Sequence, residues 1–300
     1  MRPAEWTEYE LIDTSDGEKL ERWGEEFFIR PDPQVIWSTR RGPEWSRAHA
    51  HYHRSSSGGG KWEFLQKITS PSTISRKGLK FKIEPTGFKH MGLFPEQAVN
   101  WDLFSRLIQG AGRPVRVLNL FAYTGGATLA CAAAGAEVCH VDASKGMVAW
   151  ARENAALSGL SDKPVRWIVD DCEKFVAREL RRGRRYDAVI MDPPSYGRGP
   201  NGEIWKLEDK IYPLLTLCAQ VLSEQPLFFA LNSYTTGLSP SVMRYLLGVT
   251  VGERFSEVTA DEIGLPVTKT CLLYTSLKRH RIELKHHAHA DSYTDHSCLP

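Results

Sequence analysis

The sequence predicts an α/β protein, in which a parallel β-sheet is covered by helices on both faces and preceded by a small β-rich domain. From about residue 97, short apolar runs alternate with helix-like segments, beginning with VRVLNLF and GGATLACAAAGA and continuing with EVCHVD and SKGMVAWARENAALSG. Strands that alternate with helices pair in parallel, because each helix returns the chain to the same end of the sheet. Up to about residue 90, only short strand-like pieces such as EFFIRP and LKFKIEP occur, separated by Pro and Gly.

The alternation continues to the end of the expected sheet. The next pairs are VRWIVDD with CEKFVARELRRG and YDAVIMD with LEDKIYPLLTLCAQVLS, and the strand PLFFALN follows. We therefore expect a β-rich domain at residues 1–90, an α/β domain at residues 91–276, and a tail at residues 277–300. The tail is rich in His and Lys and has little periodicity, which is typical of a disordered or non-native end.

Composition limits the class of protein. The 300 residues are 42% hydrophobic and 25% charged, which is ordinary for a globular protein with a real core. No run of 18 apolar residues occurs and the first residues are acidic, so neither a membrane span nor a signal peptide is expected. The six cysteines lack CxxC spacing, which predicts reduced thiols in a cytoplasmic protein and no metal site.

Charge is distributed unevenly although the net charge is only +2. Residues 1–36 hold four Lys or Arg and ten Asp or Glu, whereas residues 37–90 hold eleven Lys or Arg and three Asp or Glu. The basic segment also carries aromatic side chains, among them Trp37, Trp45 and Tyr52. Cations that alternate with rings suit a polyanion with exposed bases, because cations contact phosphates and rings stack on bases. A solvated basic face is the alternative.

Glycine and aspartate stand where three successive expected strands end. Gly125 and Gly126 follow the first strand, Asp142 ends the second, and Asp171 follows the third. Glycines let the backbone approach a ligand closely, and carboxylates can accept hydrogen bonds from ribose hydroxyls or an adenine amino group. Helix packing and helix capping are the alternative roles. With no P-loop and no GxGxxG, the set indicates a site for an adenosine without phosphates, which points to S-adenosylmethionine as cofactor.

The fourth expected strand ends in Asp192 and is followed at once by Pro193, Pro194 and Ser195, with Tyr196 next. The Asp192 carboxylate and the Pro193 carbonyl can accept hydrogen bonds from an amine or nucleobase, and the Tyr196 ring is close enough in sequence to stack on it. The prolines hold these acceptors rigid. We therefore expect Asp192, Pro193, Pro194 and Tyr196 to be catalytic.

Several blocks, among them VLNLFAYTGGATLACAAAGAEVCHVD and DAVIMDPPSYGRGPNGEIWKLED, resemble the class I S-adenosylmethionine-dependent methyltransferases related to the bacterial 23S ribosomal RNA large-subunit enzymes. The resemblance covers about residues 85–270 and includes GFKHMGLFPEQAVNW. It implies a Rossmann-like, seven-stranded methyltransferase sheet and a ribosomal RNA substrate. It also implies cofactor contacts from Gln97, Phe121, Tyr123, Gly125, Asp142, Ala143, Ser144, Asn154, Asp171 and Asp192.

The chain departs from this family in two places. Members that methylate cytosine C5 need a cysteine nucleophile after the fifth strand, whereas ALNSYTTG has none. A purine nitrogen is therefore the favoured target. The alternatives are a cytosine-C5 RNA methyltransferase, a methyltransferase for a protein or small-molecule amine, and a non-catalytic RNA-binding protein. In the second place, LPVTKT begins the expected final hairpin, and CLLYTS is the candidate for its last strand unless the natural end is missing.

Overall fold

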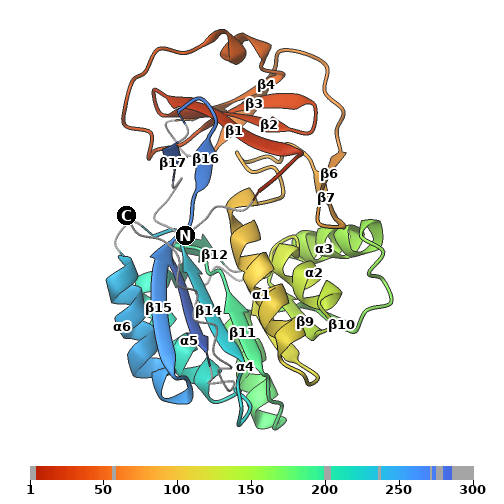
Figure 1. Cartoon of the computed structure of the whole chain (residues 1–300), viewed down its shortest axis with the longest axis vertical. Coiled ribbons are helices and arrows are strands. Elements are labelled where there is room, and N and C mark those ends of the chain that lie inside the picture. Colours follow the sequence, from red (N-terminus) through yellow and green to blue (C-terminus); the bar gives the residue numbers. More distant parts are fainter. Residues whose placement is uncertain are drawn as a thin grey trace, which may run out of the picture.

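The structure is a computed structural model that describes residues 5–55, 59–198, 204–235, 238–270, 272–274 and 280–285. Two β-sheets stand one above the other, and helices surround the larger one (Figure 1). Among the described residues, no helix has both the length and the apolar character needed to cross a membrane.

The larger sheet is parallel apart from one strand. Its order is β10-β9-β8-β11-β14-β18-β15, and only β18 runs antiparallel to its neighbours. These strands are β8 (Arg116–Leu120), β9 (Glu137–Asp142), β10 (Val165–Val169), β11 (Ala188–Met191), β14 (Phe228–Ser233), β15 (Glu257–Glu262) and β18 (His280–Lys285). The predicted Rossmann-like sheet of seven strands is confirmed.

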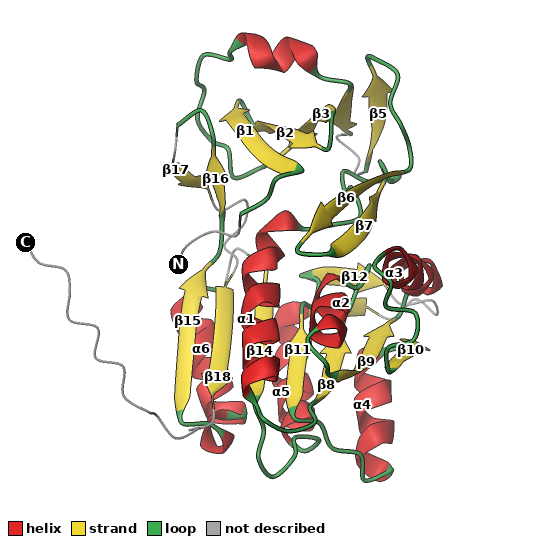
Figure 2. Ribbon diagram, turned by 45° about the vertical axis from the view of Figure 1, so that its right-hand side comes forward, coloured by secondary structure: helices red, strands yellow, loops and turns green. Residues whose placement is uncertain are grey.

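In the described part of the chain, six helices cover the two faces of this sheet, three on each side (Figures 1 and 2). One layer consists of α1 (Ala98–Gly110), α2 (Gly126–Ala133) and α3 (Lys145–Leu157); the other consists of α4 (Cys172–Arg181), α5 (Leu207–Ala219) and α6 (Pro240–Thr250). In the central strand β11, Val189 and Met191 pack in the core under α4, α5 and α6, whereas Ala188 and Ile190 pack in the core under α1 and α2. Side chains alternate along a strand, so a strand buried on both faces is apolar throughout.

The smaller sheet has the order β17-β16-β1-β2-β3-β4-β5. Its strands are β1 (Tyr9–Ser15), β2 (Glu18–Trp23), β3 (Glu26–Pro31), β4 (Ala50–Arg54), β5 (Gly60–Phe64), β16 (Leu265–Val267) and β17 (Leu272–Tyr274). Two hairpins stand apart, one of β6 (Ser72–Arg76) and β7 (Leu79–Ile83) and one of β12 (Tyr196–Arg198) and β13 (Ile204–Lys206). Three short 3-10 helices are η1 (Pro43–Arg47), η2 (Pro95–Gln97) and η3 (Gly252–Arg254).

The expectation for CLLYTS is wrong. Leu272–Tyr274, its described part, forms β17 in the smaller sheet, and β18 supplies the antiparallel strand between β14 and β15. The chain before β17 is tied to β1, because the amides of Thr268 and Lys269 donate to the carbonyls of Leu11 and Ile12. Of the tail expected at residues 277–300, residues 280–285 are described and form β18; the rest lies outside the described residues.

A buried ion pair lies in the smaller sheet. Arg30 makes two hydrogen bonds to Glu21, at 2.5 and 2.8 Å, and the hydroxyl of Tyr9 donates to the same carboxylate at 2.7 Å. Burial alone would favour the neutral acid, but the charges of Arg30 and Lys19 hold the pKa of Glu21 at about 2. Glu21 thus stays ionised, and its bonds to Arg30 join β2 to β3. Lys19 and Arg30 also line a cavity between the smaller and the larger sheet.

The two sheets are joined by a continuous core. Phe28 and Phe81 from the first 90 residues belong to the same buried cluster as Trp101, Leu129 and Ala155. The division expected at residue 90 stays a prediction, and this core crosses it.

Asn154 on α3 fastens the β6–β7 hairpin to the larger domain. Its Oδ1 accepts from the amide of Lys82 at 2.8 Å, and its Nδ2 donates to the carbonyl of Thr124 at 2.9 Å. The residue is fully buried. One turn further along α3, Ser158 makes a similar but exposed pair of bonds to the amide and carbonyl of Lys80.

We predict that Asn154→Ala destabilises the protein by about 2–6 kcal/mol, because it leaves two backbone groups unpaired in the interior at about 1–3 kcal/mol each. Urea unfolding measures the change. Ser158→Ala is the matched control and should cost under about 1 kcal/mol, because water can replace its bonds. Equal losses in the two variants would contradict this role for Asn154.

Candidate functional site

The turn between β8 and α2 is held in an unusual backbone conformation. Phe121, Tyr123 and Gly125 all have positive φ, at 53°, 51° and 88°. A Cβ at Gly126 would lie 2.4 Å from the ring of Trp101, and one at Gly125 would lie 3.0 Å from Ala151 Cβ. Packing therefore requires both glycines, and their close contacts bring the start of α2 against α1 and α3.

Asp142, at the end of β9, is bonded to this turn. Its Oδ2 accepts from the amide of Tyr123 at 2.9 Å, and its Oδ1 accepts from the amide of Ser144 at 2.8 Å. Burial raises the pKa of Asp142, and the two backbone donors oppose this. The cap of α3 is Ser144, whose hydroxyl accepts from the amide of Met147. Asp142 therefore does not cap the helix by itself, and each of its oxygens retains a lone pair for a ligand.

Asp171 and Asn154 make structural contacts. Asp171 is exposed and caps α4, accepting from the amide of Lys174 at 2.8 Å. Asn154 uses both ends of its amide on backbone groups. A cofactor contact from either residue stays a prediction. Ala143 is exposed beside Asp142, at the start of α3.

Asp192 follows β11 and is linked to a chain of polar side chains. Its Oδ2 accepts from the hydroxyl of Tyr234 at 3.3 Å, and that hydroxyl accepts from Gln97 Nε2 at 2.9 Å. Asn100 donates to Gln97 Oε1 at 2.8 Å and to Asn232 Oδ1 at 3.0 Å. This series of hydrogen-bonded side chains joins α1 to the carboxyl ends of β11 and β14, where Asp192, Asn232 and Tyr234 lie.

The second oxygen of Asp192 is buried and has no hydrogen-bond partner among the described residues. Burial raises the pKa of Asp192 to about 7, and the bond from Tyr234 only partly offsets this. A buried acceptor without a donor costs about 1–3 kcal/mol, so such an atom in a cavity suits a ligand that brings the donor.

Two cavities meet at this point. The inner cavity is lined by Leu93, Phe94, Gln97, Trp101, Phe104, Asn119, Phe121, Ala122, Tyr123, Thr124, Gly126, Ala127, Ile190, Asp192 and Asn232. The outer cleft, of about 200 Å³, is lined by Lys19, Arg30, Pro31, Asp32, Lys89, His90, Leu93, Phe94, Pro95, Glu96, Pro194 and Tyr234. Leu93 and Phe94 therefore line both, and the outer cleft lies between the smaller sheet and the carboxyl ends of the larger one.

The structure brings together part of the predicted site. Gln97, Phe121, Tyr123 and Asp192 line the inner cavity, and Pro194 lines the outer cleft. Tyr196 is 52% exposed in the β12–β13 hairpin and lines neither cavity. The roles predicted for these residues, and for Pro193, stay predictions.

The roles of two aromatic residues escape sequence reasoning. The sequence marks Tyr234 only as part of a strand end without cysteine, yet its hydroxyl bridges Gln97 and Asp192. Phe94 has no signal of its own beyond its place in GFKHMGLFPEQ; its ring lies 5.4 Å from that of Tyr123 and 5.7 Å from that of Tyr234.

The four described cysteines are all buried. Burial raises the pKa of Cys131, Cys172 and Cys218 far above that of an ordinary thiol, and it raises the pKa of Cys139 to about 11. Such thiols are protonated at neutral pH and are poor nucleophiles.

The residues present fit S-adenosylmethionine. The Asp142 carboxylate can accept from ribose hydroxyls, and the inner cavity offers rings and the carboxyl group of Asp192 to a positively charged sulfonium. No Lys or Arg of the described residues lines the inner cavity, which agrees with a cofactor that carries no phosphate. When bound, S-adenosylmethionine supplies an electrophilic methyl group.

The strand order of the larger sheet, together with the glycine-containing turn after β8, is that of a class I S-adenosylmethionine-dependent methyltransferase. Residues 35–211 match the family described as S-adenosylmethionine-dependent methyltransferase, and the chain belongs to that family. The match includes more than half of the 300 residues.

Solved structures of other methyltransferases share this fold. The crystal structure of an S-adenosylmethionine-dependent methyltransferase from Agrobacterium tumefaciens is 36% identical, with a TM-score of 0.88 over 94% of this chain and 91% of that one. The methyltransferase SMU.776, solved with SAH, shares the fold at 18% identity, with a TM-score of 0.71 over 94% of this chain and 76% of that one.

Curated relatives match a shorter stretch. Ribosomal RNA large subunit methyltransferase K/L of Shewanella sp. strain MR-4 is 38% identical over 128 residues, which is 42% of this chain and 17% of the relative. The protein of the same name from Shewanella oneidensis is 38% identical over 127 residues. The matched stretch thus spans about a sixth of the length of these relatives.

We predict that Asp192→Asn stabilises the protein relative to wild type as pH rises. The pKa of Asp192 is about 7 in the folded protein and about 4 when unfolded, so the folded state holds an extra proton between these values. The stability that this proton contributes is complete below about pH 4 and is lost as pH rises through about 7. Asparagine has no such proton, so the variant should gain about 3 kcal/mol over wild type at about pH 8 relative to about pH 4.5.

Urea unfolding at the two pH values measures this difference. Asp102→Asn is the control, because Arg76 and Lys77 lower the pKa of Asp102 despite its partial burial. Its effect should not change between the same two pH values. A pH-independent difference between wild type and Asp192→Asn would contradict the assignment of a raised pKa to Asp192.

Proposed function

We propose that this methyltransferase acts on a purine nitrogen of RNA, with large-subunit ribosomal RNA as the substrate. The observation that carries the proposal is the unpartnered oxygen of Asp192, which lies where the inner cavity adjoins the outer cleft. The relatives named as ribosomal RNA methyltransferases support the substrate class.

A nitrogen nucleophile needs acceptors and no thiolate. A ring or exocyclic nitrogen attacks through its own lone pair, whereas cytosine C5 must first be activated by covalent attack on the neighbouring carbon. An ionised Asp192 would accept a hydrogen bond from the amino group of the base and orient the nitrogen lone pair toward the methyl group of bound S-adenosylmethionine. The N–C bond would form as the S–C bond breaks and the sulfur leaves as a neutral thioether, and Asp192 would take up the proton that the nitrogen loses. The protonated state of the buried cysteines favours this chemistry.

The outer cleft offers a place for the base and its phosphate. The ring of His90 lies 5.4 Å from that of Phe94, which in turn is close to Tyr234, so three rings follow one another beside Pro194. Lys19, Arg30 and Lys89 also line this cleft. Burial lowers the pKa of Lys89 to about 8, which leaves it mainly charged at neutral pH. Rings beside cations fit a splayed nucleotide.

The lining of the two cavities favours Phe94 over Tyr196 as the residue that stacks on the base. Tyr196 is exposed outside both cavities, whereas Phe94 lines both of them. We therefore assign base stacking to Phe94.

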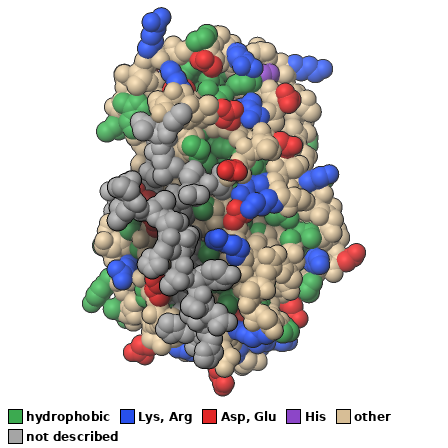
Figure 3. Space-filling model, in the orientation of Figure 1, with side chains coloured by type: hydrophobic (Ala, Val, Ile, Leu, Met, Phe, Trp, Pro, Cys, Tyr) green, Lys and Arg blue, Asp and Glu red, His purple; other side chains and the backbone are tan. Residues whose placement is uncertain are grey.

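The basic side chains that could form an RNA surface lie in different parts of the fold. Arg41 is committed to Asp16 and Glu18 and lies over the ring of Trp45, whereas Arg40 is exposed. A second group of basic residues, Arg181, Arg182, Arg184 and Arg185, lies at the C-terminal end of α4 and just beyond it, at the end of the sheet opposite Asp192. On the face in Figure 3, Lys and Arg are scattered among Asp and Glu. The outer cleft is lined in part by residues of the smaller sheet, so we place the RNA contact on that sheet.

We predict that Phe94→Ala weakens RNA binding by about 1–3 kcal/mol, roughly 5- to 150-fold, because a base loses its stacking partner. Tyr196→Ala is the matched control and should bind RNA as wild type does. Asp192→Ala should leave cofactor binding largely intact but lower turnover at least about a hundredfold, because the group that positions the nitrogen is lost.

Mass spectrometry of ribosomal RNA from a deletion strain, methylated by each variant, identifies the base and the rate. RNA containing 5-fluorocytosine should give no covalent adduct. A trapped adduct would overturn the assignment of a nitrogen target, and a larger loss of RNA affinity for Tyr196→Ala than for Phe94→Ala would overturn the assignment of base stacking to Phe94. Methylation of a protein or a small amine in place of RNA would overturn the substrate class.

We predict that binding to large-subunit ribosomal RNA weakens steeply with salt, because phosphate contacts release counterions. Lys89→Gln and Arg40→Glu should each flatten the slope of log K against log[salt], by about one unit for each phosphate that is no longer bound. Arg184→Glu with Arg185→Glu, at the far end of the sheet, is the control and should leave the slope unchanged. An affinity that does not depend on salt would remove RNA as the substrate.

A further inference from the structure

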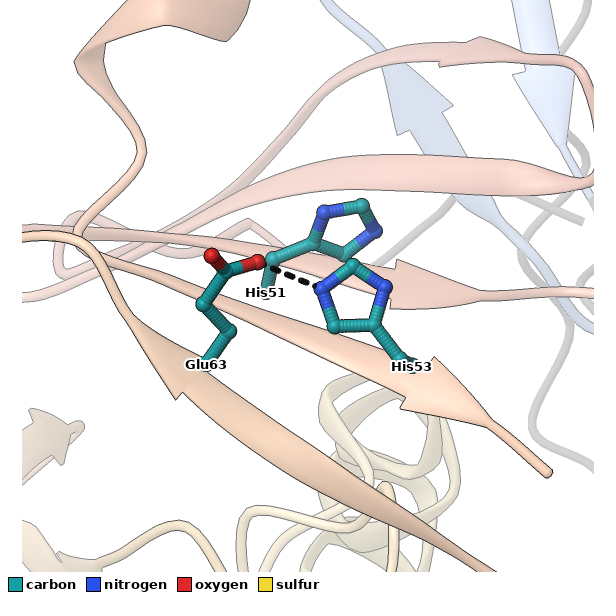
Figure 4. A group of neighbouring side chains, drawn as sticks. All are labelled: His51, His53 and Glu63. Carbon is teal, nitrogen blue, oxygen red and sulfur yellow. Dashed lines mark hydrogen bonds and ion pairs between the residues drawn. The ribbon is translucent and has the colours of Figure 1, made fainter.

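Two histidines and a glutamate meet on one face of the smaller sheet, away from the methyltransferase site (Figure 4). His51 and His53 alternate on β4 and so lie on the same face, and Glu63 on β5 stands directly opposite His51. His53 Nε2 lies 2.7 Å from Glu63 Oε2, and the two imidazole rings are 4.0 Å apart between centroids. One donor atom from each of the three residues lies within 4.8 Å of the others.

We propose that His51, His53 and Glu63 bind a divalent transition-metal ion, with zinc the best fit. Imidazole nitrogen together with carboxylate oxygen suits zinc and disfavours calcium and magnesium, which take oxygen ligands. Zinc bonds to these atoms are about 2.0–2.2 Å long, so tetrahedral ligands lie about 3.3 Å apart. The three donor atoms lie within 4.8 Å of one another on the same side of the two strands, so side-chain rotation is needed to bring all of them to that spacing (Figure 4).

Glu18 and Arg41 support the cluster from behind. Glu18 Oε1 lies 2.5 Å from His51 Nε2, and Arg41 bonds the other oxygen of the same carboxylate at 2.9 Å. A carboxylate bonded to a ligating histidine fixes the ring's orientation and its proton. Glu18 belongs to β2, so the site draws on three strands of the sheet.

The location gives the ion a structural role. β5 is the outermost strand and pairs only with β4 among the described residues. His53 is 43% exposed and Glu63 is 55% exposed at their side chains, so their mutual bond alone holds the hairpin weakly. An ion would join β4 to β5 at this open edge and hold in place a hairpin that lies within the basic segment, residues 37–90.

Histidines near the C-terminus complicate the test. Of the ten in the chain, five are His280, His286, His287, His289 and His296, and they can bind metal without any folded site. The experiment therefore starts from the full chain with these five replaced by asparagine, stripped of metal with a chelator. Zinc affinity is measured by competition with a chromophoric chelator, and the visible absorption of bound Co²⁺ reports the geometry.

We expect this tail variant to bind one ion with a tetrahedral Co²⁺ spectrum and to melt at a higher temperature with zinc than without. Adding His51→Asn and His53→Asn, or Glu63→Gln alone, should abolish the spectrum. Glu18→Gln should keep the spectrum but weaken affinity about 10- to 100-fold. Circular dichroism of each metal-free variant confirms folding, and Glu63→Gln at an exposed position serves if the histidine variants fail to fold.

The proposal is overturned if the tail variant binds no ion, or if it binds one with the same affinity and spectrum after Glu63→Gln. Methyltransferase activity plays no part in the readout, so its absence would not affect the result.

Discussion

The site depends on the docking of residues 91–97 against the turn after β8. Thr124 Oγ1 donates to the carbonyl of Gly92 at 2.6 Å in the buried interior, and a Cβ at Gly92 would lie 2.3 Å from the ring of Trp150. This contact fixes the segment that supplies Leu93 and Phe94 to both cavities and Gln97 to the chain of bonds that reaches Asp192. The segment thus forms the wall that the two cavities share.

The sequence predicts the part of the site that one strand end determines. Asp142 and Asp192 follow parallel strands, and such strands place their carboxyl ends together, so their positions follow from the pattern of strands and helices alone. The bridge from Gln97 through Tyr234 does not, because it depends on a distance between residues that are 137 positions apart. Proximity in the sequence favours Tyr196 as the stacking residue, yet the hairpin carries it away from both cavities.

The same distinction explains the fold. Alternating strands and helices determine a parallel sheet locally, and this expectation holds from β8 to β14. Short strands near the end have no such pattern to indicate a partner. Leu265–Val267 and Leu272–Tyr274 are apolar enough for either sheet, and backbone bonds from Thr268 and Lys269 to β1 decide in favour of the smaller one. Ser144 takes the capping role that the sequence leaves open to Asp142, which only side-chain geometry can reveal.

The return of β16 and β17 to the first sheet has a consequence for synthesis on the ribosome. Strand β1 pairs with β16, so residues near the start of the chain acquire a neighbour that is made about 250 residues later. The smaller sheet therefore cannot complete itself while the α/β part is still emerging, and its last contacts close a very long loop. The larger sheet is also completed late, because β18, which lies between β14 and β15, is made after β16 and β17. Both sheets therefore lack a strand until synthesis has passed the last of these segments.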